Sequence, residues 1–213
     1  MHRAGSYLAT SWCFVFLLVT SAAAHPHMWV DLESQVILNN KGSTTAIKQV
    51  WLFDDFFSTA VIEDAGLHPD GVSAGIQEEI DRIVTSLEPY DYFTLIKQGS
   101  RKLPLTFGGD IAWKIIQNRI QMTFTVTIDD YTEVGTKNFS YSIFDPTYYV
   151  EMAHLEDATI KIKGEASNKC NSWIEQPNPS SDAVALSQST TLDNDPDETI
   201  GKLFAETIHV NCG

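Results

Sequence analysis

Apolar and polar residues alternate strictly in several stretches of this chain, and the alternation limits the possible folds. Within residues 119–128 every second residue is large and apolar: Ile120, Met122, Phe124, Val126 and Ile128. Successive side chains of a β-strand point to opposite faces, so this pattern predicts a strand with one buried face. A similar alternation over residues 28–38 ends in the turn sequence Asn39-Asn40-Lys41-Gly42, and a β-rich run over residues 44–53 follows. This order predicts a β-hairpin.

The apolar period changes to that of a helix in one part of the chain. The run Asp54-Asp55-Phe56-Phe57-Ser58 begins with residues that cap helices, and helical spacing continues to Gly66. A second helical pattern covers residues 73–87 and ends before Pro89. Strand patterns then return at residues 92–98, 102–107, 112–117, 119–128, 139–144, 148–154, 158–162 and 203–210. The chain is therefore predicted to be mainly β (α+β), an antiparallel β-sandwich-like domain with a helical hairpin inserted at about residues 54–88.

The first 24 residues have the features of an export signal. His2 and Arg3 precede an apolar run, and small residues follow it, with alanine at positions 22 and 24. Cleavage after Ala24 is therefore expected, leaving one periplasmic domain of residues 25–213. No later apolar run approaches the ~20 residues that a membrane helix needs, so the mature chain is not expected to span a membrane. Residues 176–198 are rich in Pro, Ser, Asn and Asp and predict a mobile surface loop.

Charge and cysteine content narrow the functional classes. The chain has 14 basic and 28 acidic residues, which argues against nucleic acid as a partner. Cys13 lies in the expected signal, so the mature chain keeps Cys170 and Cys212. In an oxidising compartment two cysteines predict one disulfide, here tying down the C-terminus. The alternative is a pair of thiolate metal ligands.

Cleavage after Ala24 would place three nitrogen donors at the new N-terminus. They are the α-amine of His25, its imidazole and the imidazole of His27, and such donors bind zinc, copper, nickel or cobalt. Pro26 has no amide N–H, so a metal chelate through that peptide nitrogen is blocked. Cleavage after Ala23 instead would remove the amine but keep both histidines. The alternative is that both histidines are solvated and bind nothing.

Two carboxylates are predicted to lie near these histidines. In a hairpin of residues 28–38 and 44–53, the start of the first strand lies beside the end of the second. This brings Asp54 or Asp55 toward His27, where a carboxylate would complete a zinc site. The alternative is that one of the two acids only caps the following helix. Farther along, Asp145 before Pro146 predicts a turn, and His154 is interpreted as structural, with a role as a distant third ligand as the alternative.

Four motifs are spread along the mature chain: His25-Pro26-His27, the run Trp51-Leu52-Phe53-Asp54-Asp55-Phe56-Phe57-Ser58, Tyr90-Asp91-Tyr92-Phe93-Thr94, and Phe144-Asp145-Pro146-Thr147-Tyr148-Tyr149-Val150. In these motifs the chain resembles the bacterial exported family catalogued as domain of unknown function 1007. The resemblance implies a periplasmic metal-handling protein, similar to the soluble half of a two-part zinc uptake system whose membrane half looks like a nickel/cobalt permease. Many members have a calcium-loop-like stretch between the two helices. Here that stretch has Asp70 as its only carboxylate, so calcium binding is not expected.

Taken together, these patterns predict a periplasmic protein that binds a divalent transition metal and works with an inner-membrane nickel/cobalt-type permease. Zinc is the favoured metal, and nickel, cobalt or copper are alternatives. No catalysis is expected, because the sequence lacks a Gly-x-Ser-x-Gly elbow, a Gly-rich phosphate loop and a His-Glu-x-x-His helix.

Two alternative functions stay open. The first is a copper-dependent oxidative enzyme, because a tyrosine near a terminal histidine brace resembles copper oxygenases that act on polysaccharide. The close spacing of His25 and His27 argues against it. The second is a metal-free accessory subunit of the permease, in which the two histidines have no role in transport.

Overall fold

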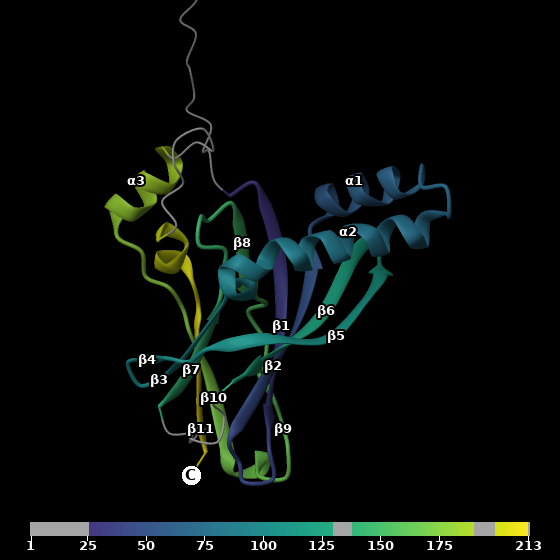
Figure 1. Ribbon diagram of the computed structural model, residues 1–213. Helices are drawn as coiled ribbons and strands as arrows, with labels where there is room; N and C mark the ends of the chain where they lie inside the picture. Colours follow the sequence, from purple (N-terminus) through teal and green to yellow (C-terminus); the bar gives the residue numbers. More distant parts are fainter. Residues whose placement is uncertain (1–25, 130–137, 190–198, 213) are drawn as a thin grey trace, which may run out of the picture.

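The computed structural model describes residues 26–129, 138–189 and 199–212 (Figure 1). The first sheet consists of β1 (Met28–Leu38), β2 (Thr44–Phe53), β5 (Leu105–Ile116), β6 (Arg119–Ile128), β8 (Val150–His154) and β9 (Lys161–Lys163). The second sheet consists of β3 (Thr94–Gln98), β4 (Arg101–Lys102), β7 (Phe139–Ile143), β10 (Cys170–Glu175) and β11 (Thr207–Cys212). Most neighbouring strands are antiparallel, and the predicted mainly β, α+β class is confirmed. β8 and β9 differ, because both pair with β1 in the parallel direction.

The core lies between the inner faces of the two sheets. The predicted buried face of β6 is confirmed. All five of its alternating apolar residues are buried: Ile120, Met122, Phe124, Val126 and Ile128. Each large apolar side chain buried in this way contributes about 1.5–3 kcal/mol relative to exposure. Polar contacts also cross the core, because Gln49 on β2 donates from Nε2 to Thr94 Oγ1 on β3 at 2.7 Å. The two sheets are thus fixed to each other by packing and by hydrogen bonds.

The predicted helical hairpin is confirmed and is inserted between β2 and β3. It consists of α1 (Asp55–Ala65) and α2 (Val72–Leu87), which lie side by side next to β5 and β6 (Figure 1). Ser58 of α1 joins the hairpin to the first sheet, because its Oγ accepts the Ile120 N–H at 3.0 Å. Gly75 of α2 allows close helix contact, since a Cβ there would lie 2.8 Å from the Cβ of Ala65.

Several boundaries differ from the sequence prediction. The two strands expected at residues 102–107 and 112–117 are largely one strand, β5, whose register shifts at Gly109. The strand expected from residue 92 begins only at Thr94, because Asp91 and Tyr92 have positive φ values of 52°. The strand expected over residues 203–210 starts at Thr207, after a short 3-10 helix, Ile200–Phe204. β10 was not predicted.

The expected loop over residues 176–198 needs a correction. Its described part contains a helix, α3 (Ser181–Ser189), and residues 190–198 lie outside the described residues. The hydroxyl of Ser180 accepts the Ala183 N–H at 3.2 Å at the start of this helix. Ala183 and Ser187 are buried one helical turn apart, so α3 rests on the body of the domain.

The two late cysteines form the predicted disulfide. Cys170 and Cys212 face each other in the register of β10 and β11, with a Cα–Cα distance of 4.0 Å and a sequence separation of 42 residues. The bond closes the end of the second sheet.

Among the described residues, no helix has the length and apolar character required to cross a membrane.

Candidate functional site

The start of β1 is where the sequence predicted a metal site. His25 lies outside the described residues, whereas His27 is exposed directly before β1. The backbone N–H of His27 donates to the Tyr149 carbonyl at 2.9 Å. Its imidazole stacks on the Tyr149 ring, with centroids 4.8 Å apart and an angle of 27° between the planes. Tyr149 therefore holds both the backbone and the ring of His27.

The hairpin brings Asp54 to the same end of β1. Val30 pairs with Phe53, so Asp54 lies directly beyond that pair. The Asp54 N–H donates to the Trp29 carbonyl at 3.0 Å, and Asp54 Oδ2 accepts the Trp29 N–H at 2.9 Å. Asp54 therefore lies at the start of β1, beside Trp29, which is two residues along the chain from His27. Its closer approach to the His27 side chain stays a prediction.

Asp54 also has the alternative role that the sequence indicated. Its Oδ1 accepts the Phe57 N–H at 2.8 Å, which makes Asp54 the N-cap of α1. Asp55 is the first residue of α1 and is exposed. Metal ligation by either acid stays a prediction.

We expect Asp54→Ala to lower the free energy of unfolding by about 1–2 kcal/mol, because it leaves the N–H groups of Phe57 and Trp29 without their acceptor. Urea unfolding in the presence of a chelator measures the loss without any contribution from bound metal. Asp55→Ala is the matched control, since the Asp55 side chain makes no hydrogen bond within the described part of the chain, and we expect a change below about 0.5 kcal/mol. Equal losses in the two variants would contradict the capping role.

Two further acidic side chains lie near the start of β1. Glu151 on β8 accepts the Trp29 Nε1–H at 3.0 Å with its Oε2. Asp31, farther along β1, is paired with Arg119 at 2.8 Å. Asp54 and Glu151, by contrast, accept hydrogen bonds only from neutral N–H groups among the described residues. Neither carboxylate is paired with a cationic side chain in the described part of the chain, so the start of β1 has a net negative charge, which favours a cation. Among the residues that the structure describes, no three His, Cys, Asp or Glu side chains form a group that could hold a metal ion.

The buried carboxylate of Asp145 organises the turn that carries Tyr149, as the sequence predicted. Its Oδ1 accepts the N–H and the hydroxyl of Thr147, both at 2.9 Å. Its Oδ2 accepts the Val150 N–H at 3.0 Å. Asp145 thereby fixes the start of β8 and the position of Tyr149 beside His27.

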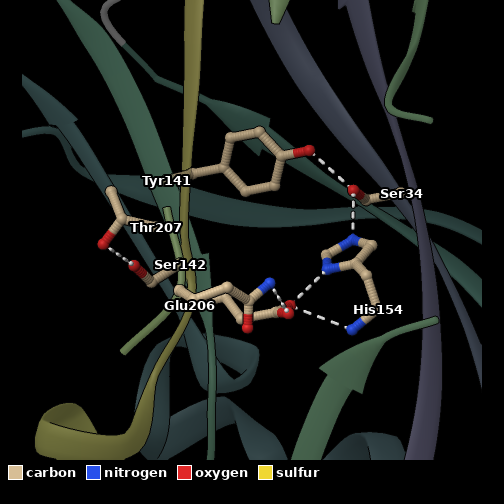
Figure 2. Close-up of polar contacts among 7 residues, drawn as sticks. Ser34, Tyr141, Ser142, His154, Glu206 and Thr207 are labelled. Atoms are coloured by element: carbon tan, nitrogen blue, oxygen red, sulfur yellow. Dashed lines mark hydrogen bonds and ion pairs between the residues drawn. The ribbon is translucent and has the colours of Figure 1, made fainter. Parts of the chain in front are cut away.

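A second polar cluster lies between the two sheets (Figure 2). We call its four residues, Ser34, Tyr141, His154 and Glu206, the inter-sheet cluster. Ser34 Oγ lies 2.6 Å from Tyr141 Oη and 2.9 Å from His154 Nε2. His154 Nδ1 lies 2.8 Å from Glu206 Oε2, which also accepts the His154 backbone N–H at 2.9 Å. Both ring nitrogens of His154 are thus engaged, as expected of a structural histidine.

The pKa shifts of Glu206 and Tyr141 indicate which groups of this cluster carry protons. Burial raises the pKa of Glu206, but hydrogen bonds from the side chain and backbone of His154 and from Gln176 outweigh burial, so its pKa lies below the ordinary value. Glu206 is therefore a carboxylate that accepts the Nδ1–H of His154. In the tautomer with its proton on Nδ1, Nε2 can accept the Ser34 hydroxyl proton. Burial raises the pKa of Tyr141, which a hydrogen bond with Ser34 opposes only in part, so the Tyr141 hydroxyl keeps its proton. Either hydroxyl of this pair can be the donor.

Another hollow lies between α1 and α2 and has a volume of about 590 Å³. Its wall is partly apolar, with Phe57 and Val61, and partly charged, with Asp64 and Glu78. His68 in its wall is paired with Glu78 at 3.2 Å. This cleft is separate from both the start of β1 and the inter-sheet cluster.

Comparisons with known proteins agree with the resemblance seen in the motifs. The chain matches the family described as protein of unknown function (DUF1007) over residues 10–212. A protein of Haemophilus influenzae that is named only as uncharacterized is 24% identical over 196 residues, which cover 89% of this chain and 91% of that protein. No solved structure shows a significant match. Because the family match extends from before the start of β1 to the last cysteine, this chain belongs to the DUF1007 family.

Proposed function

We propose that this protein is a periplasmic carrier of a divalent transition metal, with zinc as the favoured cargo, and that it exchanges the metal with an inner-membrane nickel/cobalt-type permease. The proposed binding site is the start of β1. The observation that carries the proposal is the setting of His27, an exposed imidazole held by Tyr149. It lies two residues before Trp29, on which two carboxylates, Asp54 and Glu151, are anchored.

The donors at this position suit zinc. The proposed ligands are the imidazoles of His25 and His27, the amine of His25 if cleavage follows Ala24, and a carboxylate oxygen of Asp54 or Asp55. Each carboxylate oxygen can accept two hydrogen bonds or bind a metal while it accepts one, so the capping contacts of Asp54 leave room for ligation. Nickel, cobalt and copper bind the same nitrogen and oxygen donors, so they stay alternatives.

A site at a chain end also suits release of the cargo. Ligands on a terminal segment can be replaced one at a time by ligands of a partner protein, without rearrangement of a core. Asp54 and Tyr149 are held by the body of the domain, whereas His25 precedes the first strand. We therefore propose that transfer starts with exchange of the His25 donors.

We expect the double variant His25→Ala, His27→Ala to lower zinc affinity by about 10²-fold or more. Loss of one residue that only orients a metal ligand already costs about 10–100-fold, and the double variant removes the ligands themselves. Isothermal titration of the mature protein, with its first residue verified, measures this loss. The matched control is the double variant His68→Ala, His209→Ala, which removes two histidines paired with Glu78 and Glu175 elsewhere. A similar loss in the control, or none in the first variant, would overturn the proposed site.

A further inference from the structure

We propose that the inter-sheet cluster is an acyl-transfer site in which Ser34 is the nucleophile, separate from the metal site at the start of β1. The three groups that such chemistry needs lie in series. Ser34 Oγ is 2.9 Å from His154 Nε2, and His154 Nδ1 is 2.8 Å from a carboxylate oxygen of Glu206. A serine, a histidine base and a carboxylate that orients the base form the arrangement of serine hydrolases, which is recognised by geometry and not by order in the sequence.

An opening in the first sheet gives access to this series. β1 pairs with β8 as far as Leu32 and His154, and pairing resumes with β9 only at Gln35 and Lys161. Between these points residues 155–160 leave the edge of β1. A cavity of about 250 Å³ lies there, and Ser34 and His154 are part of its wall. Ser34 and His154, which are 4% and 7% exposed, therefore lie at the buried side of this cavity.

The cavity indicates the class of substrate. Its wall includes the apolar residues Leu32, Leu155 and Ala158, while Glu33 and Lys161 in its wall are paired with each other at 2.9 Å. The remaining charged residue of the wall, Asp157, is acidic, so the wall disfavours an anionic ligand. The volume is below the ~300 Å³ at which pockets for drug-sized ligands begin. A neutral ester with a short acyl group fits both properties.

Each group of the cluster has a defined step. The Ser34 O–H bond breaks, its proton moves to His154 Nε2, and Oγ bonds to the ester carbonyl carbon, whose π electrons move to oxygen. Tyr141 Oη, 2.6 Å from Oγ, is the donor for that oxyanion. The ester C–O bond then breaks, and the leaving alcohol takes the proton from His154. Water repeats the sequence on the acyl-serine and releases the acid.

The positioning of His154 is built into the fold. Glu206 Oε2 accepts both the ring Nδ1–H and the backbone N–H of His154, and its Oε1 accepts a hydrogen bond from Gln176 at 2.9 Å. These contacts select the tautomer whose Nε2 is a base toward Ser34.

The test is labelling of the mature protein with a fluorophosphonate, beside turnover of p-nitrophenyl acetate, both in a chelator so that bound metal plays no part. We expect one label per chain on Ser34, and loss of labelling with at least ~10²-fold slower turnover in Ser34→Ala. The matched control is Ser142→Ala, which removes a buried serine of β7 that lies against Thr207 and not against a histidine. It should keep both activities.

Absence of label from the folded wild-type protein would overturn the proposal, as would equal labelling of Ser34→Ala. Near-ultraviolet circular dichroism establishes that each variant is folded. Zinc titration of the same samples keeps this test distinct from that of the metal site, because Ser34→Ala should bind zinc as the wild type does.

Discussion

Glu206→Ala should lower the free energy of unfolding by about 3–5 kcal/mol, the cost of removing one partner from a buried charged contact. The side chains of Glu206 and His154 are 5% and 1% exposed, so both partners are removed from bulk solvent. The substitution leaves two N–H groups of His154 and the amide of Gln176 without their acceptor. Urea unfolding monitored by tryptophan fluorescence measures the loss.

The exposed pair of His209 and Glu175 supplies the control for this prediction. Its N···O distance is 2.7 Å, close to that of the buried pair, but the Glu175 side chain is 66% exposed. Exposed ion pairs contribute about 0–1 kcal/mol, so Glu175→Ala should have little effect. Equal losses for Glu175→Ala and Glu206→Ala would show that burial does not determine the contribution of the pair.

Acid should weaken the contribution of Glu206. Because the folded protein lowers the pKa of this carboxyl, the stabilisation is complete above the pKa of the unfolded chain, ~4.3, and is lost as the pH falls through the folded pKa. The difference in unfolding free energy between wild type and Glu206→Gln should therefore shrink as the pH falls below ~4.3. A difference that grows on acidification would contradict the direction of the pKa shift.

Gly201→Ala should cost about 3 kcal/mol or more, at the upper end of the range for overpacking. Gly201 lies buried in the 3-10 helix Ile200–Phe204, and its N–H donates to the Pro146 carbonyl at 2.8 Å. A Cβ at this position would overlap the carbonyl oxygen of Asp145. Backbone atoms cannot rotate away as a side chain can, so the helix and the turn must separate.

The effect of Gly201→Ala should reach the start of β1, because the Asp145 turn carries Tyr149. Gly99→Ala is the control: a Cβ there meets no atom within 4 Å, and only its φ of 60° opposes the change, at about 1–2 kcal/mol. Thermal unfolding compares the two variants. A loss for Gly201→Ala no larger than that for Gly99→Ala would contradict the close contact.

Local patterns explain which parts of the fold were predictable. The alternation in β6 and the spacing of Ile76, Ile80, Val84 and Leu87 in α2 report which face of an element is buried, and both were predicted. The disulfide prediction followed from the number of cysteines and from the expected oxidising compartment. α3 was missed because the Pro- and Ser-rich composition around it hides a short apolar stretch. The register shift at Gly109 in β5 was missed because the sequence around it was interpreted as a gap between two strands.

The start of β1 and the inter-sheet cluster also differ in how far they could be predicted from local sequence. Asp54 was predicted near the start of β1 because a hairpin brings its own ends together, a local property of the chain. In the inter-sheet cluster, Ser34 contacts two residues that are 107 and 120 positions away in the sequence. The cluster therefore depends on how the two sheets pack. One signal was present: Ser34 is a polar residue in the inward series of β1, between Leu32 and Val36. Its partners Tyr141 and Glu206 had no local signal.

Native mass spectrometry of the mature protein, isolated from periplasm, tests metal carriage most directly. One spectrum gives both the first residue of the chain and its metal load. We expect His25 as the first residue and one zinc ion per chain, absent from the double variant His25→Ala, His27→Ala. A wild-type protein that carries no metal and takes up none when zinc is added would contradict the carrier function and favour a metal-free accessory subunit of the permease.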